Sequence, residues 1–444
     1  EGNGNKGFGT IPKMKIITGL SQSNLFLESV RNPIDINTNT LNSEYTTSLT
    51  NSVRKLIDDI KIRGDVAIKE ITFNLDNVKL DNIEIDPNKI LDGFNNTNKN
   101  LIDSLHIAAK RITDYHTKTL PRNWTDELEG YGQVINPVDS AGVYIPKNLI
   151  STVLMTVIPA KIAGVKKVYI CTPPDTSGVP SNEILAACHI SKADKVFTVS
   201  GAQAIAALAY GTNTIPKVNL ICGPGGIYTT IAKKLVYGDV GIDGLYGPTE
   251  TLIIADNNAN PILCASDLVA QAEHDKLAIP ICVTTSISLG HSISQEAVLR
   301  SKHIDRNIIA YDSITNRGAV LVVDNLDQAF ELANNFGPEH ISLMISEPTK
   351  HIEKIRNAGA IFIGDHSHEV MGDYVAGPSH VMPTSGTAKF NSGLNVNTFL
   401  KFSPVVKINK STSRTLSSVA AAIAKAEGLT GHAEAAEIRN EIDS

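Results

Sequence analysis

Cysteine is scarce in this sequence, and the few copies are dispersed. The 444 residues include five cysteines, and no two of them form a Cys-x-x-Cys pair. An odd number spread through apolar segments argues against a disulfide framework, so we expect buried thiols in a reducing compartment. They are Cys171, Cys188, Cys222, Cys264 and Cys282.

Long hydrophobic runs are also lacking. No apolar run reaches the roughly eighteen residues needed to span a bilayer. The N-terminal residues do not combine a basic region with an apolar stretch, as a secretion signal would. We therefore expect a cytoplasmic protein, neither secreted nor membrane-bound. The opening residues 1–13, rich in Gly and Asn, are left out of the fold prediction.

Positive charge is not in excess. Lys and Arg number 40 against 46 Asp and Glu, which gives a formal net charge of −6. This balance offers no basic surface for nucleic acid or anionic lipid and favours small-molecule chemistry. Hydrophobic residues at 42% and charged residues at 19% exclude a disordered chain. A chain of 444 residues is expected to form two or three domains.

The order of apolar segments predicts an α/β protein. Residues 45–75 and 99–117 have apolar positions at helical spacing, so the first hundred-odd residues are expected to be mainly helical. From about residue 134, short Val- and Ile-rich runs alternate with helix-period segments, which is typical of βαβ units. Strands are expected at 141–145, 166–171, 195–199, 217–222, 251–255, 279–284, 319–323, 341–345 and 360–363, and helices at 152–164, 182–190, 202–210, 226–236, 262–275, 292–302, 326–335 and 348–357.

These two series predict two tandem Rossmann-like (incomplete) parallel-sheet domains with a helical N-terminal region and a small C-terminal tail domain. Ligands are expected at the C-terminal ends of the strands. In the tail, an Ala-rich helix near 416–426 is expected rather than a third sheet. The predicted first domain is discontinuous (14–143 with 250–394) and includes the helical region, the second covers 144–249, and the tail covers 395–444.

Two segments place an imidazole beside another polar group where an α/β fold could expose it. Gln271 and His274 end a predicted helix three residues apart, so they share a face and could converge on one metal ion. A solvated helix end explains the pair as well. On spacing alone, the solvated helix end is the favoured interpretation. Glu339 and His340 directly precede a strand and suit proton transfer. An isolated Glu-His pair, however, is usually a pair of surface residues with no functional role.

Two further segments combine glycine with possible ligands. Asp373 and His380 lie in a stretch too rich in Gly and Pro to be regular, where Asp is either a metal ligand or a turn residue. Glu427 and His432 flank Gly428 and Gly431, which would let the backbone approach a bound group or would end a helix.

Signals for a nucleotide cofactor are weaker. There is no Gly-x-Gly-x-x-Gly motif, but the turn from Gly223 to Gly226 follows a predicted strand and opens a helix, which permits a phosphate near backbone amides. The segment from Gly201 to Gln203 has the same status. Glycine in any tight βα turn explains both equally well.

Taken together, these motifs resemble those of histidinol dehydrogenases, in order and spacing, from about residue 45 to 440. The combination of motifs is far more specific for this family than any single motif. The segments are Ser151-Thr152-Val153-Leu154-Met155, Gly201-Ala202-Gln203, Gly223-Pro224-Gly225-Gly226, Gly247-Pro248-Thr249-Glu250, Gln271-Ala272-Glu273-His274, Pro338-Glu339-His340, Gly372-Asp373-Tyr374, Gly377-Pro378-Ser379-His380 and Glu427-Gly428-Leu429-x-x-His432.

The resemblance implies one zinc ion per subunit and a domain-swapped homodimer in which the C-terminal tail lies on the partner. It implies zinc ligation by Gln271, His274, Asp373 and the partner subunit's His432. It also implies substrate contacts from Ser151, Thr249, Gln271, His274, His340, Asp373, His380, Glu427 and His432.

The implied reaction converts L-histidinol to L-histidine in two NAD-linked oxidations through a bound aldehyde, as the last steps of histidine biosynthesis. His340 would take the hydroxyl proton, and Glu339 would activate the water that attacks the aldehyde. By resemblance, NAD lies near Tyr144 and Gln203, with Gly226 at the same turn.

Two departures from the family pattern fall in the cofactor region. Gly226 stands where the family usually carries Asn, and the loop 145–150 looks about three residues shorter than the family's version. One alternative is therefore a paralogous dehydrogenase that oxidises another small alcohol. A second alternative is a non-catalytic Rossmann-like binding protein with structural zinc, although the Glu339–His340 pair would then have no purpose.

Overall fold

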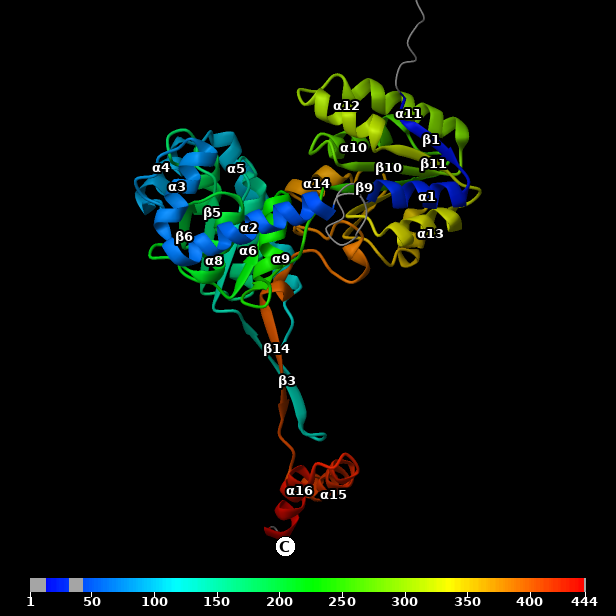
Figure 1. Cartoon of the computed structure of the whole chain (residues 1–444). Helices are drawn as coiled ribbons and strands as arrows, with labels where there is room; N and C mark the ends of the chain where they lie inside the picture. Colours follow the sequence, from blue (N-terminus) through cyan, green and yellow to red (C-terminus); the bar gives the residue numbers. More distant parts are fainter. Residues whose placement is uncertain (1–12, 32–42, 443–444) are drawn as a thin grey trace, which may run out of the picture. The chain divides into compact units, whose positions relative to one another are not determined.

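Two parallel sheets organise most of the chain in the computed structural model, which describes residues 13–31 and 43–442 (Figure 1). The chain divides into two units. The first comprises residues 1–119 and 139–399 and contains both parallel sheets, and the second comprises residues 120–138 and 400–444. Apart from Lys13, the opening segment left out of the fold prediction lies outside the described residues.

The larger sheet has six parallel strands, and the residues of its four central strands are almost all buried. Helices cover both of its faces, as such a sheet requires. Helices α10 (Pro261–Ala272), α11 (Ile287–Ser301) and α12 (Asn307–Asn316) pack on one face, and α1 (Leu20–Arg31) and α13 (Leu326–Phe336) pack on the other. Across the sheet the strands are β1 (Lys15–Thr18), β11 (Ala319–Val322), β10 (Ile279–Thr284), β9 (Glu250–Ala255), β12 (His340–Met344) and β13 (Ala360–Ile363).

The smaller sheet has five parallel strands. In order they are β6 (Lys195–Thr198), β5 (Lys167–Thr172), β4 (Ser140–Tyr144), β7 (Leu220–Cys222) and β8 (Gly241–Ile242). Its connecting helices are α6 (Ile150–Ile162), α7 (Asn182–Ser191), α8 (Gly201–Tyr210) and α9 (Ile227–Val236). The predicted fold class, with two incomplete Rossmann-like sheets in tandem, is confirmed.

The helical N-terminal region packs on the smaller sheet's layer, which differs from the predicted division into domains. Its helices are α2 (Ser43–Arg63), α3 (Asp65–Asp76), α4 (Pro87–Asn96) and α5 (Lys99–Lys118). Helix α2 contacts α8 and α9, α4 contacts α7, and α5 contacts α6, whereas the prediction grouped residues 43–118 with the larger sheet. Helical spacing shows that an apolar face exists, but it does not show which sheet will cover that face.

Shorter elements complete the first unit. The segment predicted as a helix at 348–357 is a 3₁₀ helix, η1 (Pro348–Lys354), and α14 (Glu369–Tyr374) follows β13. Two more 3₁₀ turns are η2 (Thr387–Lys389) and η3 (Val396–Phe399). Within the described part of the chain, no helix is both long and apolar enough to cross a membrane.

The second unit contains a third sheet, so the prediction of a tail without one is wrong. Strand β14 (Leu400–Val406) pairs antiparallel with β3 (Tyr131–Pro137), which pairs with β2 (Trp124–Asp126). The pairing joins segments far apart in sequence, a contact that the local pattern of either segment does not encode. Helices α15 (Lys410–Ala426) and α16 (Thr430–Ile442) follow, so the predicted Ala-rich helix is present and begins earlier.

A buried ion pair fixes the turn that follows β7. Lys233 Nζ donates to Asp243 Oδ1 at 2.6 Å and to the Gly223 carbonyl at 2.7 Å. Asp243 Oδ2 accepts the Gly223 N–H at 2.8 Å, and both charged side chains are almost fully buried, at 2% and 0% exposed. Both backbone polar groups of Gly223 are thus held by this one pair.

Replacing Lys233 with Met is expected to lower the free energy of unfolding by about 3–5 kcal/mol, because the Asp243 carboxylate would stay buried without its partner. Urea denaturation followed by circular dichroism measures the change. The control is Lys195→Met, whose pair with Glu84 is partly exposed and should cost less than about 1 kcal/mol. Equal losses in the two variants would contradict this role of the buried pair.

Candidate active site

Polar side chains converge at the amino ends of β9 and β12, which are neighbours in the larger sheet. Thr249 precedes β9, Glu339 precedes β12, and His340 is the first residue of β12. Thr249 Oγ1 donates to Glu339 Oε2 at 2.6 Å, and the backbone N–H of Glu250 donates to the same oxygen at 3.2 Å. Burial raises the pKa of Glu339 well above its usual value, against the opposing hydrogen bond from Thr249.

Two helices bring further predicted residues to this point. Gln271, in the last turn of α10, has its Oε1 3.1 Å from Thr249 Oγ1, and its Nε2 donates to Asp373 Oδ2 at 3.4 Å. Asp373 belongs to the short helix α14. Burial raises the pKa of Asp373 to about 6, and the hydrogen bond from Gln271 opposes the shift.

His340 is held with one ring nitrogen free. Nδ1 lies 3.3 Å from the Glu250 carbonyl, which only an N–H can approach as a hydrogen bond, so Nε2 carries the lone pair. Nε2 lies 3.8 Å from Asp373 Oδ1, and it is buried without a hydrogen-bond partner among the described residues. Burial lowers the pKa of His340 to about 3. The imidazole is therefore neutral near pH 7 and can accept a proton at Nε2.

His380 links the site to the smaller sheet's layer. Its Nδ1 lies 2.7 Å from the Asp373 carbonyl, and its Nε2 lies 2.9 Å from Thr152 Oγ1 in the first turn of α6. Burial lowers the pKa of His380 to about 4. Ser151, the predicted substrate contact, directly precedes Thr152 and is half-buried. Sequence reasoning missed Thr152, although the quoted motif contains it.

His274 lies at the rim of this group. It follows α10, its side chain remains partly open to solvent, and its backbone N–H donates to the Gln271 carbonyl. Desolvation lowers the pKa of His274, whereas Glu273 raises it. The positive charge that His274 can carry lowers the pKa values of His340 and His380, which places the three imidazoles in one neighbourhood.

Glu427 and His432 belong to the second unit. Glu427 ends α15, His432 lies in the first turn of α16, and both side chains are exposed. Their place at the active site remains a prediction.

The predicted cofactor residues gather at the carboxyl ends of β4 and β7. Strand order reverses between these two strands, and such a switch point is where open α/β sheets usually bind ligands. The Tyr144 hydroxyl accepts a hydrogen bond from the Gly201 backbone. Gln203 is 2% exposed, and its Nε2 is buried with no partner among the described residues. This unpaired donor fits a ligand with hydrogen-bond acceptors.

Two glycines of the adjacent turn differ in how much room they have. A Cβ on Gly223 would lie 2.2 Å from the Tyr144 carbonyl oxygen, and its φ is +109°, so only glycine suits this position. Gly226 has φ −70°, and a Cβ there would meet nothing within 4 Å. The turn therefore has room for a side chain at Gly226.

The predicted site residues of the two sheets lie at opposite ends of their strands. Thr249 and His340 lie at the amino ends of strands in the larger sheet, not at the carboxyl ends where ligands were expected, whereas the predicted cofactor turn lies at the carboxyl ends in the smaller sheet. The hydrogen bond between Thr152 and His380 shows that these opposite edges meet. The C-terminal end of α10 lies at the same edge of the larger sheet as the amino ends of β9 and β12. Gln271, in the last turn of that helix, therefore reaches the site.

The sequence profile described as Histidinol dehydrogenase matches residues 40–440. The chain belongs to the histidinol dehydrogenase family. A histidinol dehydrogenase from Dehalococcoides mccartyi is 44% identical over 389 residues, which are 87% of this chain and 89% of that protein. One from Synechococcus sp. is 42% identical over 398 residues, covering 88% and 92%. The crystal structure of histidinol dehydrogenase from Elizabethkingia anophelis matches with a TM-score of 0.90 at 30% identity, covering 97% of this chain and 99% of that one.

These similarities confirm the predicted family and the prediction that the chain is an oxidoreductase of the histidinol dehydrogenase type. The residues of the first unit also fit a metal ion. Gln271, His274 and Asp373 offer an amide oxygen, an imidazole and a carboxylate, and the last two are ligands that zinc prefers. The unpaired His340 Nε2 faces Asp373.

No group of three or more His, Cys, Asp or Glu side chains is arranged as a metal cage in the described ranges. The predicted ligand set explains this result, because it includes a glutamine and because His432 belongs to the second unit. Within the first unit, only two predicted ligands are of those residue types.

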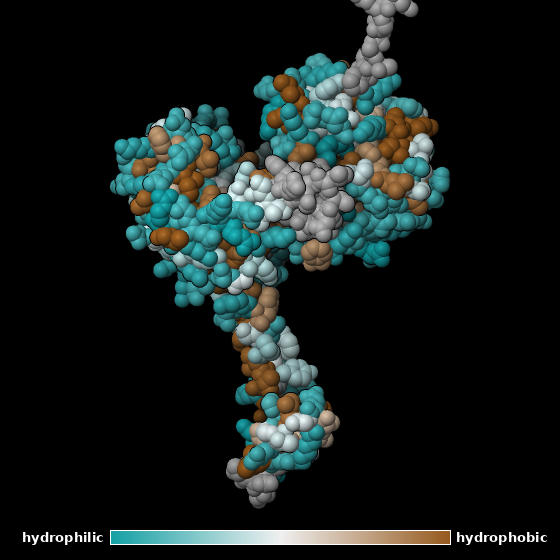
Figure 2. Space-filling model, in the orientation of Figure 1, coloured by the Kyte–Doolittle hydropathy of each residue, from teal (hydrophilic) through white to brown (hydrophobic). Residues whose placement is uncertain are grey.

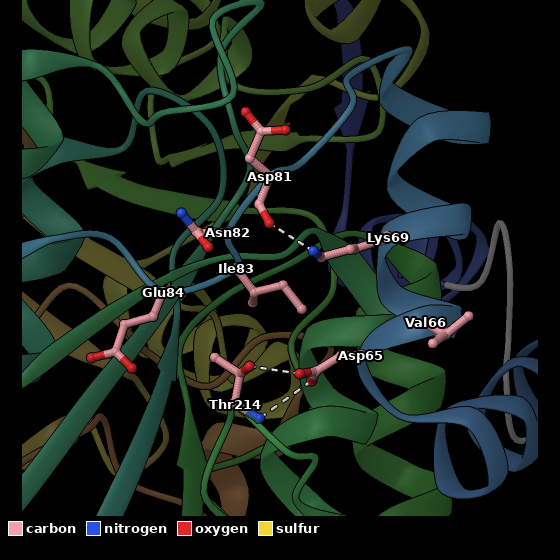
Figure 3. A pocket seen from close by; sticks show the side chains of 8 residues that line it. All are labelled: Asp65, Val66, Lys69, Asp81, Asn82, Ile83, Glu84 and Thr214. Atoms are coloured by element: carbon pink, nitrogen blue, oxygen red, sulfur yellow. Dashed lines mark hydrogen bonds between the residues drawn. The ribbon is translucent and has the colours of Figure 1, made fainter.

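A separate pocket of about 270 Å³ lies on the smaller sheet's side (Figure 3). Two of its polar contacts lie within the protein: Thr214 Oγ1 donates to Asp65 at 2.6 Å, and Lys69 donates to the Asp81 carbonyl at 2.6 Å. None of the predicted site residues lines it, and these contacts tie α3 to neighbouring loops. Its lining consists of Asp65, Val66, Lys69, Asp81, Asn82, Ile83, Glu84 and Thr214.

Proposed function

We propose that the chain oxidises L-histidinol through L-histidinal to L-histidine in the cytoplasm, with two NAD per turnover and one zinc ion per subunit. The observation that supports this most strongly is the convergence of Thr249, Gln271, Glu339, His340 and Asp373 at one sheet edge. These residues lie far apart in sequence, and each belongs to a motif shared with the family.

Gln271, His274, Asp373 and the partner subunit's His432 would hold the zinc ion, which would supply a Lewis acid that orients the substrate. Ser151, Thr249, His380 and Glu427 would make further contacts. Glu427 would pair with a polar group of the substrate, and a site built around such a bond rejects analogues that lack the group.

The geometry of His340 suits it to remove the hydroxyl proton. The Glu250 carbonyl fixes Nδ1–H, which leaves Nε2 as the acceptor. The imidazolium formed would lie 3.8 Å from Asp373 Oδ1 and 3.8 Å from Glu339 Oε2, so two carboxyl groups can stabilise its charge.

Glu339 suits the second oxidation, in which water must attack the aldehyde. Its carboxyl group is buried, and hydrogen bonds from Thr249 and the Glu250 N–H orient it. Burial raises the pKa of this group. A carboxylate with a raised pKa is a stronger base than a solvated one, so Glu339 can take the proton of the attacking water.

NAD would bind at the carboxyl ends of β4 and β7. Gln203 offers a buried, unpaired amide, and the turn from Gly223 to Gly226 offers backbone N–H groups at the start of α9. Tyr144 lies beside Gly223, since a Cβ on Gly223 would lie 2.2 Å from the Tyr144 carbonyl oxygen.

His340→Gln is expected to lower the rate of NAD reduction with L-histidinol about 10²–10⁴-fold, because the proton acceptor is lost. It should leave bound zinc nearly unchanged, whereas His274→Ala should empty the metal site. Turnover is measured by NADH absorbance, and zinc by elemental analysis. Loss of zinc in His340→Gln would contradict its role. Turnover of other alcohols only would indicate the paralogue, and an inactive, folded parent would indicate a binding protein.

Gly226→Asn is expected to lower the KM for NAD severalfold. The backbone accepts any residue there, the space is open, and the Asn that the family usually carries would add a side-chain contact to NAD. The KM is measured by initial rates at saturating L-histidinol, with Gly226→Ala as a control that adds a methyl group but no polar contact. An equal change in both variants would show that a cofactor contact is not responsible.

The second unit needs a covering surface, which supports a swapped homodimer. Over the residues whose side chains are described, the buried apolar cluster of its helices consists of Ala421, Ala424 and Ala433. Figure 2 shows hydrophobic residues along its strands. A surface this apolar typically marks an interface, and a second copy of this chain is the proposed partner. The exposed apolar residues are Leu120, Trp124, Leu128, Tyr131, Phe402, Val406, Ile408, Leu416, Val419, Ile423, Leu429 and Ile438.

Mixing two inactive variants tests the swap. If His432 completes the partner's site, co-refolded His274→Ala and His432→Ala chains form mixed dimers with one intact site and one doubly altered site. About half of the dimers would be mixed, so the mixture should regain about a quarter of the parental activity. Either variant refolded alone is the control. A mixture that stays inactive while mixed dimers form would show that each chain completes its own site.

A further inference from the structure

Four of the polar residues at the sheet edge, Thr249, His340, Gln271 and Asp373, each have a second polar residue one repeat deeper in the protein. Thr251 follows Thr249 by two positions, and Ser342 follows His340 by two, so each pair shares a face of its strand. Asp267 precedes Gln271 by four positions, and Glu369 precedes Asp373 by four, so each pair shares a face of its helix. A second polar layer therefore underlies the candidate active site.

The deeper layer is joined by hydrogen bonds to one carboxyl group. Thr251 Oγ1 and Ser342 Oγ both donate to Glu369 Oε1, the latter at 2.9 Å. Thr251 is 0% exposed, Ser342 2% and Glu369 1%. Since the two hydroxyls come from β9 and β12, a single oxygen of Glu369 ties both strands to α14.

This attachment matters because α14 is short and carries Asp373. The helix has six residues, too few to form a stable helix without tertiary contacts. Its Gly372 packs against the Phe362 ring, where a Cβ would come within 2.7 Å, so the helix already lies close to the sheet. The position of the Asp373 carboxylate thus follows from how Glu369 is held.

We propose that Glu369 is a positioning residue, and that its hydrogen bonds with Thr251 and Ser342 set the metal affinity of the site by fixing Asp373. This rests on the proposed function, since it assumes that Asp373 is a zinc ligand. Residues that orient a metal ligand typically change metal affinity about 10–100-fold when they are lost.

The test measures zinc affinity of the full-length protein by competition with a chromogenic chelator. Glu369→Met, which keeps a side chain of similar length but no acceptor, is expected to weaken zinc binding about 10–100-fold. The Thr251→Val/Ser342→Ala double variant should weaken it similarly. Adding Glu369→Met to that double variant should cause little further loss, because both remove the same hydrogen bonds. Glu369→Gln should restore most of the affinity, because its amide oxygen can accept both hydroxyls.

A second readout is the absorption spectrum of the cobalt-substituted protein, which should change in Glu369→Met and return to the parental shape in Glu369→Gln. Ser294→Ala is the matched control, since this buried hydroxyl donates to the Met14 carbonyl in the same α/β layer without touching the site. It should leave zinc affinity within about twofold of the parent. If Glu369→Met does not fold, Thr251→Val alone removes one hydrogen bond and should still weaken zinc binding severalfold.

The outcomes separate the two proposals. A parent that binds no zinc tightly would overturn the proposed metal site itself. A parent that binds zinc tightly, together with folded Glu369→Met and Thr251→Val variants of unchanged affinity, would overturn the role of Glu369 alone. Failure of Glu369→Gln to recover affinity, with additive losses in the combined variant, would also overturn it.

Discussion

The hydrogen bonds of His380 join two sheet edges that parallel α/β architecture normally keeps apart. One ring nitrogen contacts the Asp373 backbone beside the amino edge of the larger sheet, and the other contacts Thr152 above the carboxyl edge of the smaller sheet. A cofactor held at a carboxyl edge can therefore face reacting groups held at an amino edge.

Burial decides the protonation of this site. Glu339, Asp373, His340 and His380 lie where water is largely excluded, so the pKa values of the two carboxyl groups are raised and those of the two imidazoles are lowered. Neutral imidazoles and poorly solvated carboxylates are good ligands for a cation, and a carboxylate of raised pKa is also a stronger acceptor for protons. The exclusion of water thus suits these side chains to both metal binding and proton transfer, the two roles that the proposed reaction requires.

The sequence predicted the elements and the residue types of the site better than their assembly. Gln271 and His274 were identified by helical spacing, and Glu339 and His340 by their place before a strand, because these are local patterns. Which sheet covers α2, and which edge carries the site, depend on contacts between distant segments that no local pattern records. Glu369 was missed for a related reason: a buried carboxylate in a Gly- and Ser-containing stretch looks like a turn until Thr251 and Ser342 are seen donating to it.

The small interior of the second unit makes its stability depend on what covers it. The helices of the second unit enclose three alanines and remove little apolar surface from water, so in the proposed homodimer most of the unit's stability would come from the partner's surface. Stability that depends on association rises with chain concentration. In that homodimer, the concentration of the chain would set the fraction of second units that are covered and stable.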